Sequence, residues 1–371
     1  MKIICAFDSF KGCMTAREAC RAAASGLRER HPDAEILCLP MSDGGEGMVD
    51  CIAEAVGAKM VSVRVHDPLM LPVEAQYALS ADGRTAYMEM AAASGLTLVP
   101  EDKRNPMLTT TYGVGEMILD AVGRGCQRIV MGIGGSATCD GGKGMIDCLE
   151  GHLPLPVVDA VLACCKRHFF RRCRAGELDE SIEIVVASDV SNPLYGPNGA
   201  AYVFAPQKGA TPDQVLLLDE RLRAFARETE VKGIAQAALA VHPGAGAAGG
   251  LGYGLMAYLG ATLQSGIDLL LDTIRFDEQI KDADLILTGE GKSDRQTLMG
   301  KVPQGVLCRA RRQGIPVHLL SGAIEDAAEL TQAGFASVHS INENDNRPLE
   351  VLMQRDVAME NIKKVTQYGL F

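Results

Sequence analysis

The most informative stretch of this sequence is a glycine-rich loop at residues 134–142. It follows an apolar run at 128–133 that is typical of a buried parallel strand, and a segment able to start a helix comes next. Such a turn presents backbone N–H groups and a positive helix end, which attract phosphate, although glycine there also has a steric explanation. Asp140 can hold a cation or accept a proton. The residues that we expect to bind a phosphate-bearing cofactor here are Gly134, Gly135, Ser136 and Thr138.

Three other loops repeat this composition, each directly after an apolar run typical of a strand. They lie at 8–12, 43–47 and 288–294, and each combines glycine with an acidic residue. Open α/β sheets bind ligands at the carboxyl ends of their strands, so four such loops fit a single site better than four coincidences. Carboxylates, lysines and glycine amides together suit a polyphosphate with Mg²⁺. We therefore add Gly289 and Gly291 to the expected cofactor-binding residues.

The composition excludes several classes of protein. With 371 residues the chain is long enough for two domains, and its net charge of −11 argues against nucleic acid or an anionic membrane surface as a partner. The twelve cysteines are scattered, with no Cys-x-x-Cys pair and no zinc spacing, so we expect reduced thiols. The N-terminus lacks the features of a signal peptide, and no apolar run reaches about 18 residues. We expect a cytoplasmic protein.

The elements that must position these loops alternate between strand and helix at both ends of the chain. Near the N-terminus, 16–30 has helical spacing, and Thr15 with Glu18 predicts a capping box at its start. From Asp67 the pattern changes to a hairpin, which is not part of a doubly wound sheet. The alternating helix and strand pattern returns from 284 to 366. The two chain ends therefore predict one doubly wound α/β domain with the middle of the chain inserted.

Two segments fit this organisation less well. The run at 151–174 gathers cysteine, phenylalanine and five lysines or arginines, and it resembles neither of its neighbours. We expect it to be the least well-packed part of the middle domain, with a possible effect on activity. The glycine-dense run at 244–254 is compatible with a flexible segment, a phosphate loop or a helix packed closely on another element.

Together with further blocks in the same order, these loops resemble the bacterial glycerate kinases, a class I family with a two-domain fold. The blocks that carry the resemblance are 8–12, 43–47, 89–91, 93–96, 104–106, 109–113, 132–138, 189–190, 192–194, 205–212, 243–250 and 288–291, with Asp294 and Thr297.

The resemblance implies both a fold and an activity. It implies a flavodoxin-like, doubly wound parallel-sheet domain from residues 1–66 and 278–371, an inserted α/β domain at 67–277, and an active site in the cleft between them. It implies phosphorylation of D-glycerate to 2-phosphoglycerate by ATP with Mg²⁺, in a monomer or homodimer. The alternatives are phosphorylation at the 3-hydroxyl or a non-catalytic sugar-acid sensor that retains the pocket. An NAD-dependent enzyme is disfavoured, because the glycine-rich loops do not give the G-x-G-x-x-G fingerprint together with an acidic residue at the end of the next strand.

Phosphoryl transfer to an alcohol needs a base or a metal to take up the hydroxyl proton. Asp189 follows the apolar run 182–187 and is the first candidate, because a carboxylate at a buried strand end costs desolvation energy unless it has a partner. An Asx turn is its alternative role. Asp8 and Lys11 complete the candidate catalytic residues. The candidate metal ligands, for which helix capping is the alternative role, are Asp43, Glu290 and Asp294.

Three residues are candidates for binding the substrate. The guanidinium of Arg104 can bind a carboxylate through two parallel hydrogen bonds. Lys208, like Lys11, can hold a phosphate or the glycerate carboxylate, and a solvated surface position is the alternative for both. Ser94 is the third candidate, although packing also explains a small residue at a helix start.

Overall fold

A computed structural model describes residues 1–45, 47–152, 170–171, 181–343 and 345–369. Contacts within the chain divide it into two compact units. The first, here called the terminal unit, comprises Met1–Asp43 and Ile267–Phe371, and the second, here called the central unit, comprises Gly44–Gly266. In the described part of the chain, no helix combines the length and the apolar character needed to cross a bilayer.

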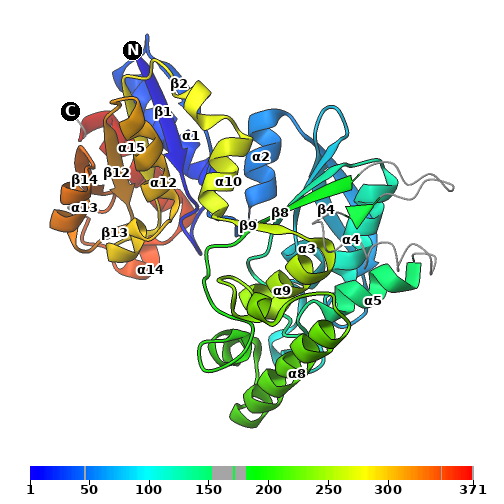
Figure 1. The fold of residues 1–371 in the computed structure, drawn as a ribbon. Coiled ribbons are helices and arrows are strands. Elements are labelled where there is room, and N and C mark those ends of the chain that lie inside the picture. Colours follow the sequence, from blue (N-terminus) through cyan, green and yellow to red (C-terminus); the bar gives the residue numbers. More distant parts are fainter. Residues whose placement is uncertain (46, 153–169, 172–180, 344, 370–371) are drawn as a thin grey trace. The chain divides into compact units, whose positions relative to one another are not determined.

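The terminal unit is built on a five-stranded parallel sheet with the order β14-β12-β10-β1-β2. Its strands are β1 (Lys2–Phe7), β2 (Glu35–Cys38), β10 (Leu285–Gly289), β12 (Val317–Ser321) and β14 (Ser337–Ser340), and a small parallel pair is formed by β11 (Lys292–Ser293) and β13 (Ala323–Ile324). Numbered within the unit, the strand order is 2-1-3-4-5, which is that of flavodoxin-like folds. Figure 1 shows the blue N-terminal strand β1 in the same unit as the orange strands β12 and β14 from the C-terminal part of the chain, and all three belong to one sheet.

The helices of this unit are α1 (Ala16–Arg30), α10 (Gly266–Thr273, with its first residue in the central unit), α11 (Phe276–Gln279), α12 (Val302–Arg312), α13 (Ala327–Ala333), α14 (Leu349–Leu352) and α15 (Arg355–Tyr368). The predicted capping box of α1 is present, because the Thr15 N–H donates to Glu18 Oε2 at 2.9 Å and Glu18 N–H donates to Thr15 Oγ1 at 3.3 Å. β1 is a continuous apolar run that is fully buried from Ile3 to Phe7, as expected of a central parallel strand.

The central unit contains a mixed sheet with the order β3-β4-β5-β6-β8-β7, and β9 also pairs with β8. The strands are β3 (Lys59–His66), β4 (Pro72–Leu79), β5 (Thr85–Glu89), β6 (Arg128–Gly132), β7 (Phe170–Arg171), β8 (Ser181–Ala187) and β9 (Thr262–Gln264). The first three strands are antiparallel, whereas β5, β6, β8 and β9 are parallel. The helices are α2 (Met48–Val56), α3 (Ala91–Ser94), α4 (Tyr112–Gly123), α5 (Lys143–His152), α7 (Ala200–Phe204), α8 (Pro212–Val231) and α9 (Ala247–Leu259).

The boundaries of the units differ from the predicted ones. Residues 44–66 belong to the central unit, because β3 pairs with β4 along its whole length and α2 packs on β4 and β5. Residues 267–277 belong to the terminal unit, where three aspartates of this segment form ion pairs with Arg309 of α12. The α/β class itself is confirmed, with a doubly wound sheet from both chain ends and an inserted α/β unit.

The glycine-dense run packs closely on another loop, which was one of its predicted alternatives. Ala248, Gly249 and Gly250 all have positive φ and interrupt α9. A Cβ on Gly249 would lie 1.9 Å from the Thr138 carbonyl oxygen, so only glycine allows this approach. The run therefore supports the loop at 134–142. Most of the unusual segment at 151–174 lies outside the described residues.

Candidate active site

The carboxyl ends of β1 and β10 lie at the switch point of the terminal sheet, where the chain leaves β1 for β2 on one side and returns at β10 on the other. Open α/β sheets bind their ligands outside this point. Asp8 follows β1 directly and Glu290 follows β10 directly, and both side chains are buried. The Asp8 N–H donates to the Gly289 carbonyl oxygen at 2.9 Å, which joins the two strand ends. The loops at 8–12 and 288–294 therefore share one edge.

Asp8 is a carboxyl group whose charge is disfavoured by its surroundings. Burial raises its pKa to about 7, and the negative charges of Asp43 and Glu290 act in the same direction. The Ser9 N–H donates to Asp8 Oδ1 at 2.7 Å, and this bond and the charge of Lys11 oppose the shift. Asp8 can therefore gain or lose a proton near neutral pH.

Glu290 is held by a set of donors. Thr297 Oγ1 and Ser293 Oγ donate to Glu290 Oε1 at 2.6 and 3.1 Å, and Lys301 Nζ lies 3.5 Å from Oε2. The Ser293 hydroxyl is also 2.6 Å from the Ser321 hydroxyl at the end of β12. These contacts fix the orientation of the carboxylate at the strand edge.

The other candidate metal ligands are placed differently. Asp294 caps a short helical turn, since its Oδ1 accepts from the Gln296 N–H at 2.8 Å, and this was the alternative that the sequence left open. Asp43 is part-exposed, and its Oδ2 is 3.9 Å from Nζ of the highly exposed Lys11.

The two glycines expected to bind cofactor differ in their surroundings. A Cβ on Gly289 would lie 1.7 Å from the Leu320 carbonyl oxygen, so packing on β12 by itself requires glycine there. A Cβ on Gly291 would meet nothing closer than 3.5 Å, where the nearest atoms are backbone of residues 10 and 11. Packing therefore does not account for Gly291.

In the central unit, Asp140 organises the glycine-rich loop between β6 and α5. Its Oδ2 accepts from the N–H and the hydroxyl of Thr111 and from the Gly144 N–H, and its Oδ1 accepts from the Gly142 N–H. With both oxygens occupied by protein donors, Asp140 stabilises the loop and the start of α5. The predicted role as a cation ligand or base does not fit these contacts.

The loop is closed on its other side by a buried lysine. Lys208 Nζ donates to Ser136 Oγ and to the Thr138 carbonyl oxygen, both at 2.7 Å, and only 3% of the residue is exposed. Burial lowers its pKa to about 8, and the nearby negative charge of Asp140 opposes this shift. The solvated position that the sequence allowed for Lys208 is therefore wrong. Lys208, Ser136 and Thr138 therefore form one cluster within the central unit, which contains one candidate substrate residue and two candidate cofactor residues.

Neighbouring residues extend this cluster. Gly209 needs to be glycine, because a Cβ would lie 2.2 Å from the Arg104 carbonyl oxygen, and this contact places Arg104 beside the lysine segment. Among the described residues, Arg104 Nε and Thr138 Oγ1 are buried without a hydrogen-bond partner. A buried polar atom without a hydrogen-bond partner destabilises the folded protein, unless a ligand or a water molecule makes the missing bond.

Ser94 is fully buried and donates to the Thr110 carbonyl oxygen at 3.3 Å, which favours its packing role.

Asp189 is not buried, although the sequence placed it at the end of a buried strand. β8 ends at Ala187, and Asp189 is exposed two residues later. Its Oδ1 accepts from the Gly266 N–H at 2.9 Å, so it caps the start of α10. Desolvation therefore gives no argument for a special chemical role.

Sequence reasoning missed Ser321 as a contributor to the strand edge. The signal was present, because Ser321-Gly322 follows a predicted strand in the same way as the other loops. It was overlooked because no acidic residue follows immediately.

No group of three or more His, Cys, Asp or Glu side chains in the described part of the chain is arranged to hold a metal ion. Mg²⁺ does not require such a group, since it commonly binds one or two carboxylates together with substrate phosphates and water. Burial and, after it, the nearby negative charges of Asp43 and Glu290 raise the pKa of Asp8, and a cation beside these carboxyl groups would act against that shift. These residues fit a divalent cation.

Comparisons with known proteins agree with this geometry. The glycerate kinase family model matches residues 3–368. A glycerate kinase of Bacillus subtilis (strain 168) is 43% identical over 350 residues, covering 92% of this chain and 90% of the relative. The glycerate 2-kinase of Escherichia coli (strain K12) is 41% identical over 352 residues, with coverage of 92% and 90%. A crystal structure of a candidate glycerate kinase 2 from Salmonella typhimurium LT2 superposes with a TM-score of 0.79 at 38% identity, covering 99% of this chain and 96% of that one.

The fold and these relatives define a phosphotransferase, that is, a kinase. With a family model that spans nearly the whole sequence and relatives above 40% identity, the chain belongs to the glycerate kinase family.

Proposed function

We propose that this kinase transfers the terminal phosphoryl group of ATP to the 2-hydroxyl of D-glycerate and forms 2-phosphoglycerate. The observation that carries the choice of substrate and position is the 41% identity to the E. coli glycerate 2-kinase over almost the full length of both chains. The acidic residues at the strand edge and the buried lysine support phosphoryl transfer. The carboxylates can bind a cation that neutralises phosphate charge, and the lysine ammonium can bind an anionic substrate.

We assign the nucleotide phosphates and Mg²⁺ to the strand edge of the terminal unit. Asp43 and Glu290 would hold the cation, which would neutralise phosphate charge, and Asp294 remains a third candidate ligand despite its capping bond. The backbone at Gly289 and Gly291 and the exposed ammonium of Lys11 would contact the phosphates.

We assign the carboxylate of glycerate to the cluster around Lys208. The lysine is buried with Ser136 as a direct partner, and the buried Arg104 Nε and Thr138 Oγ1 lack partners among the described residues. A small anion would accept hydrogen bonds from these two groups, and its negative charge would offset the desolvation energy of the buried ammonium. The N–H groups of the loop at Gly134 and Gly135 would then be available to the transferred phosphoryl group, and Ser94 would act through packing.

Asp8 and Asp189 are the two candidates for taking the hydroxyl proton. A general base works best when its pKa lies near the working pH, and the pKa of Asp8 is raised to about 7. Asp189 is exposed and already binds the Gly266 N–H. We therefore favour Asp8 as the base.

The test is to identify the product. Purified protein is incubated with ATP, Mg²⁺ and D-glycerate, and phosphorus NMR resolves the 2- and 3-phosphoglycerates. We expect 2-phosphoglycerate, with loss of product when Mg²⁺ is chelated. A 3-phosphoglycerate signal would correct the position, and the absence of both products with intact ATP would favour a sensor that binds glycerate without catalysis.

A further inference from the structure

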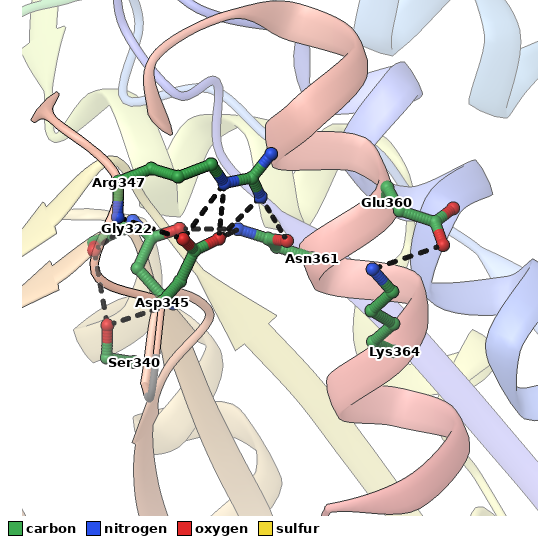
Figure 2. Close-up of polar contacts among 8 residues, drawn as sticks. Gly322, Ser340, Asp345, Arg347, Glu360, Asn361 and Lys364 are labelled. Carbon is green, nitrogen blue, oxygen red and sulfur yellow. Dashed lines mark hydrogen bonds and ion pairs between the residues drawn. The ribbon is translucent and has the colours of Figure 1, made fainter. Parts of the chain in front are cut away.

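A polar network in the terminal unit connects the segment after β14 with the C-terminal helix α15 (Figure 2). Asn361 of this helix is 5% exposed, and Figure 2 shows its side chain directed toward Asp345 and Arg347. Its Nδ2 donates to Asn342 Oδ1 at 2.9 Å and to Asp345 Oδ2 at 3.2 Å, and its Oδ1 accepts from Arg347 at 3.5 Å. Every polar atom of this buried amide therefore has a partner.

The network continues from Asn342 to the turn after β12. Asn342 Nδ2 donates to the Gly322 carbonyl oxygen at 2.8 Å, and Ser340 Oγ donates to the same oxygen at 3.2 Å. The Gly322 carbonyl oxygen can only accept, so it requires the NH₂ group of Asn342 on its side, and the Asn361 Nδ2 donates to the Oδ1 at the other end of the same amide. Asn361 and Gly322 therefore hold Asn342 from its two sides, and removing Asn361 leaves the side chain held on one side among these contacts.

The turn at Gly322 is in turn attached to the Glu290 loop. The Gly322 N–H donates to the Glu290 carbonyl oxygen at 3.3 Å, and the Ala323 N–H donates to the Gly291 carbonyl oxygen at 3.1 Å. A Cβ on Gly322 would lie 2.6 Å from that same Gly291 oxygen, so the two backbones are in direct contact. The preceding Ser321 hydroxyl contacts Ser293, which donates to the Glu290 carboxylate.

We propose that Asn361 is a positioning residue for Glu290 and acts through Asn342 and the Gly322 turn. This inference rests on the proposed function, in which Glu290 takes part in binding the cation and nucleotide. A buried amide with three hydrogen bonds specifies one arrangement of the turn, whereas an apolar residue would pack there without selecting it. The network thereby links the C-terminal helix to the phosphate-binding edge.

The experiment compares Asn361→Leu, which keeps the side-chain volume and removes the amide, with Thr366→Val. Thr366 is a matched control, because it is a fully buried polar residue of the same helix whose hydroxyl donates only to carbonyl oxygens of α15. In the ligand-free protein, hydrogen exchange at the Gly322 and Ala323 amides, measured against Leu287 of β10, should accelerate at least about tenfold in Asn361→Leu alone. Equal exchange in Asn361→Leu and wild type would overturn the proposal.

Kinetics provide the second readout. We expect Asn361→Leu to raise KM for Mg-ATP at least about fivefold with a less than twofold change in kcat, and Thr366→Val to change neither. In a double-mutant cycle, the effect of Asn361→Leu on kcat/KM should largely disappear in the Glu290→Gln background, because both changes act on the same carboxylate. Full additivity would refute action through Glu290.

Two further points keep the result interpretable. If Asn361→Leu does not fold, Asn342→Ala removes the same link at a half-buried loop position and is expected to give the same exchange and KM changes. If wild-type protein does not phosphorylate glycerate, the proposed function fails, but the exchange experiment still decides whether Asn361 holds the Gly322 turn.

Discussion

At the scale of single residues, Asp8 shows how a buried acid makes stability depend on pH. Its pKa is raised from an ordinary value of about 3.9 to about 7 in the folded protein, so the folded state binds this proton more tightly than the unfolded state. Folding stability therefore falls as the pH rises from about 4 to about 7. Asp8→Asn should increase the free energy of unfolding at pH 8, by up to roughly 4 kcal/mol, with little change at pH 4. Urea denaturation at both pH values, with exposed Asp102→Asn as control, tests this expectation.

The two candidate bases are separated by their kinetics. Asp8→Asn should lower kcat by at least about 100-fold, which is the low end of what a general base contributes. Asp189→Asn should lower kcat by less than about tenfold, because its exposed carboxylate already caps α10. Steady-state rates with saturating glycerate and Mg-ATP give both numbers. A loss of about 100-fold in Asp189→Asn would return the catalytic role to that residue.

Lys208 gives the opposite pH dependence. Its pKa is lowered to about 8, so the unfolded state binds its proton more tightly, and stability rises as the pH increases from about 8 to about 10.5. Lys208→Met should stabilise the ligand-free protein at pH 7 and raise KM for glycerate more than about tenfold. In wild type, KM for glycerate should rise above pH 8 as the ammonium loses its proton. A pH-independent KM between 7 and 9 would argue against a carboxylate at Lys208.

At the scale of elements, the glycine-rich loop depends on the interrupted helix α9. Gly249→Ala would bring a methyl group against the Thr138 carbonyl oxygen, at a position whose φ of +67° already disfavours a side chain. We expect a loss of several kcal/mol in stability and a marked loss of glycerate affinity, since Lys208 binds the same carbonyl oxygen. Gly123→Ala is the control, because a Cβ there meets no atom within 4 Å and φ is not positive. Equal melting temperatures for the two variants would contradict this account.

Elements with strong local sequence signals could be predicted from the sequence. Elements whose place in the fold depends on pairing with another strand could not. The helix at 16–30 has the predicted bounds, because its capping box and its apolar spacing define it locally. β3 was assigned to the wrong unit, because its alternating residues do not say which strand it pairs with, and the antiparallel partner β4 decides this.

The same limit applies to the site. The loops could be located, because glycine and acidic residues that follow apolar strands can be recognised in the sequence alone. The roles of Asp140 and Asp189 could not, because they depend on N–H groups brought near by folding, from residues as distant as Thr111 and Gly266. The burial of Lys208 likewise depends on a contact with Ser136, 72 positions away.

At the scale of the whole molecule, the two ligands should protect different units. Glycerate alone should slow hydrogen exchange mainly in the central unit, around Lys208 and the loop at 134–142. Mg-ATP alone should slow exchange mainly in the terminal unit, at the ends of β1 and β10. Exchange measured by mass spectrometry with each ligand separately tests the assignment. Glycerate protection confined to the terminal unit would reverse the two proposed sites.

The strand β1 is synthesised long before β10, yet both of its neighbours are needed to bury it. Ile3 of β1 pairs with Ile36 on one side and with Leu285 on the other. The pairing of β1 with β10 therefore cannot form until nearly 250 further residues have been synthesised after β2. During that time the central unit, whose residues are contiguous, is able to fold first. An apolar strand with an open edge is meanwhile available to any other chain. Nascent chains that stop before β10 should therefore depend on chaperones that cover such an edge.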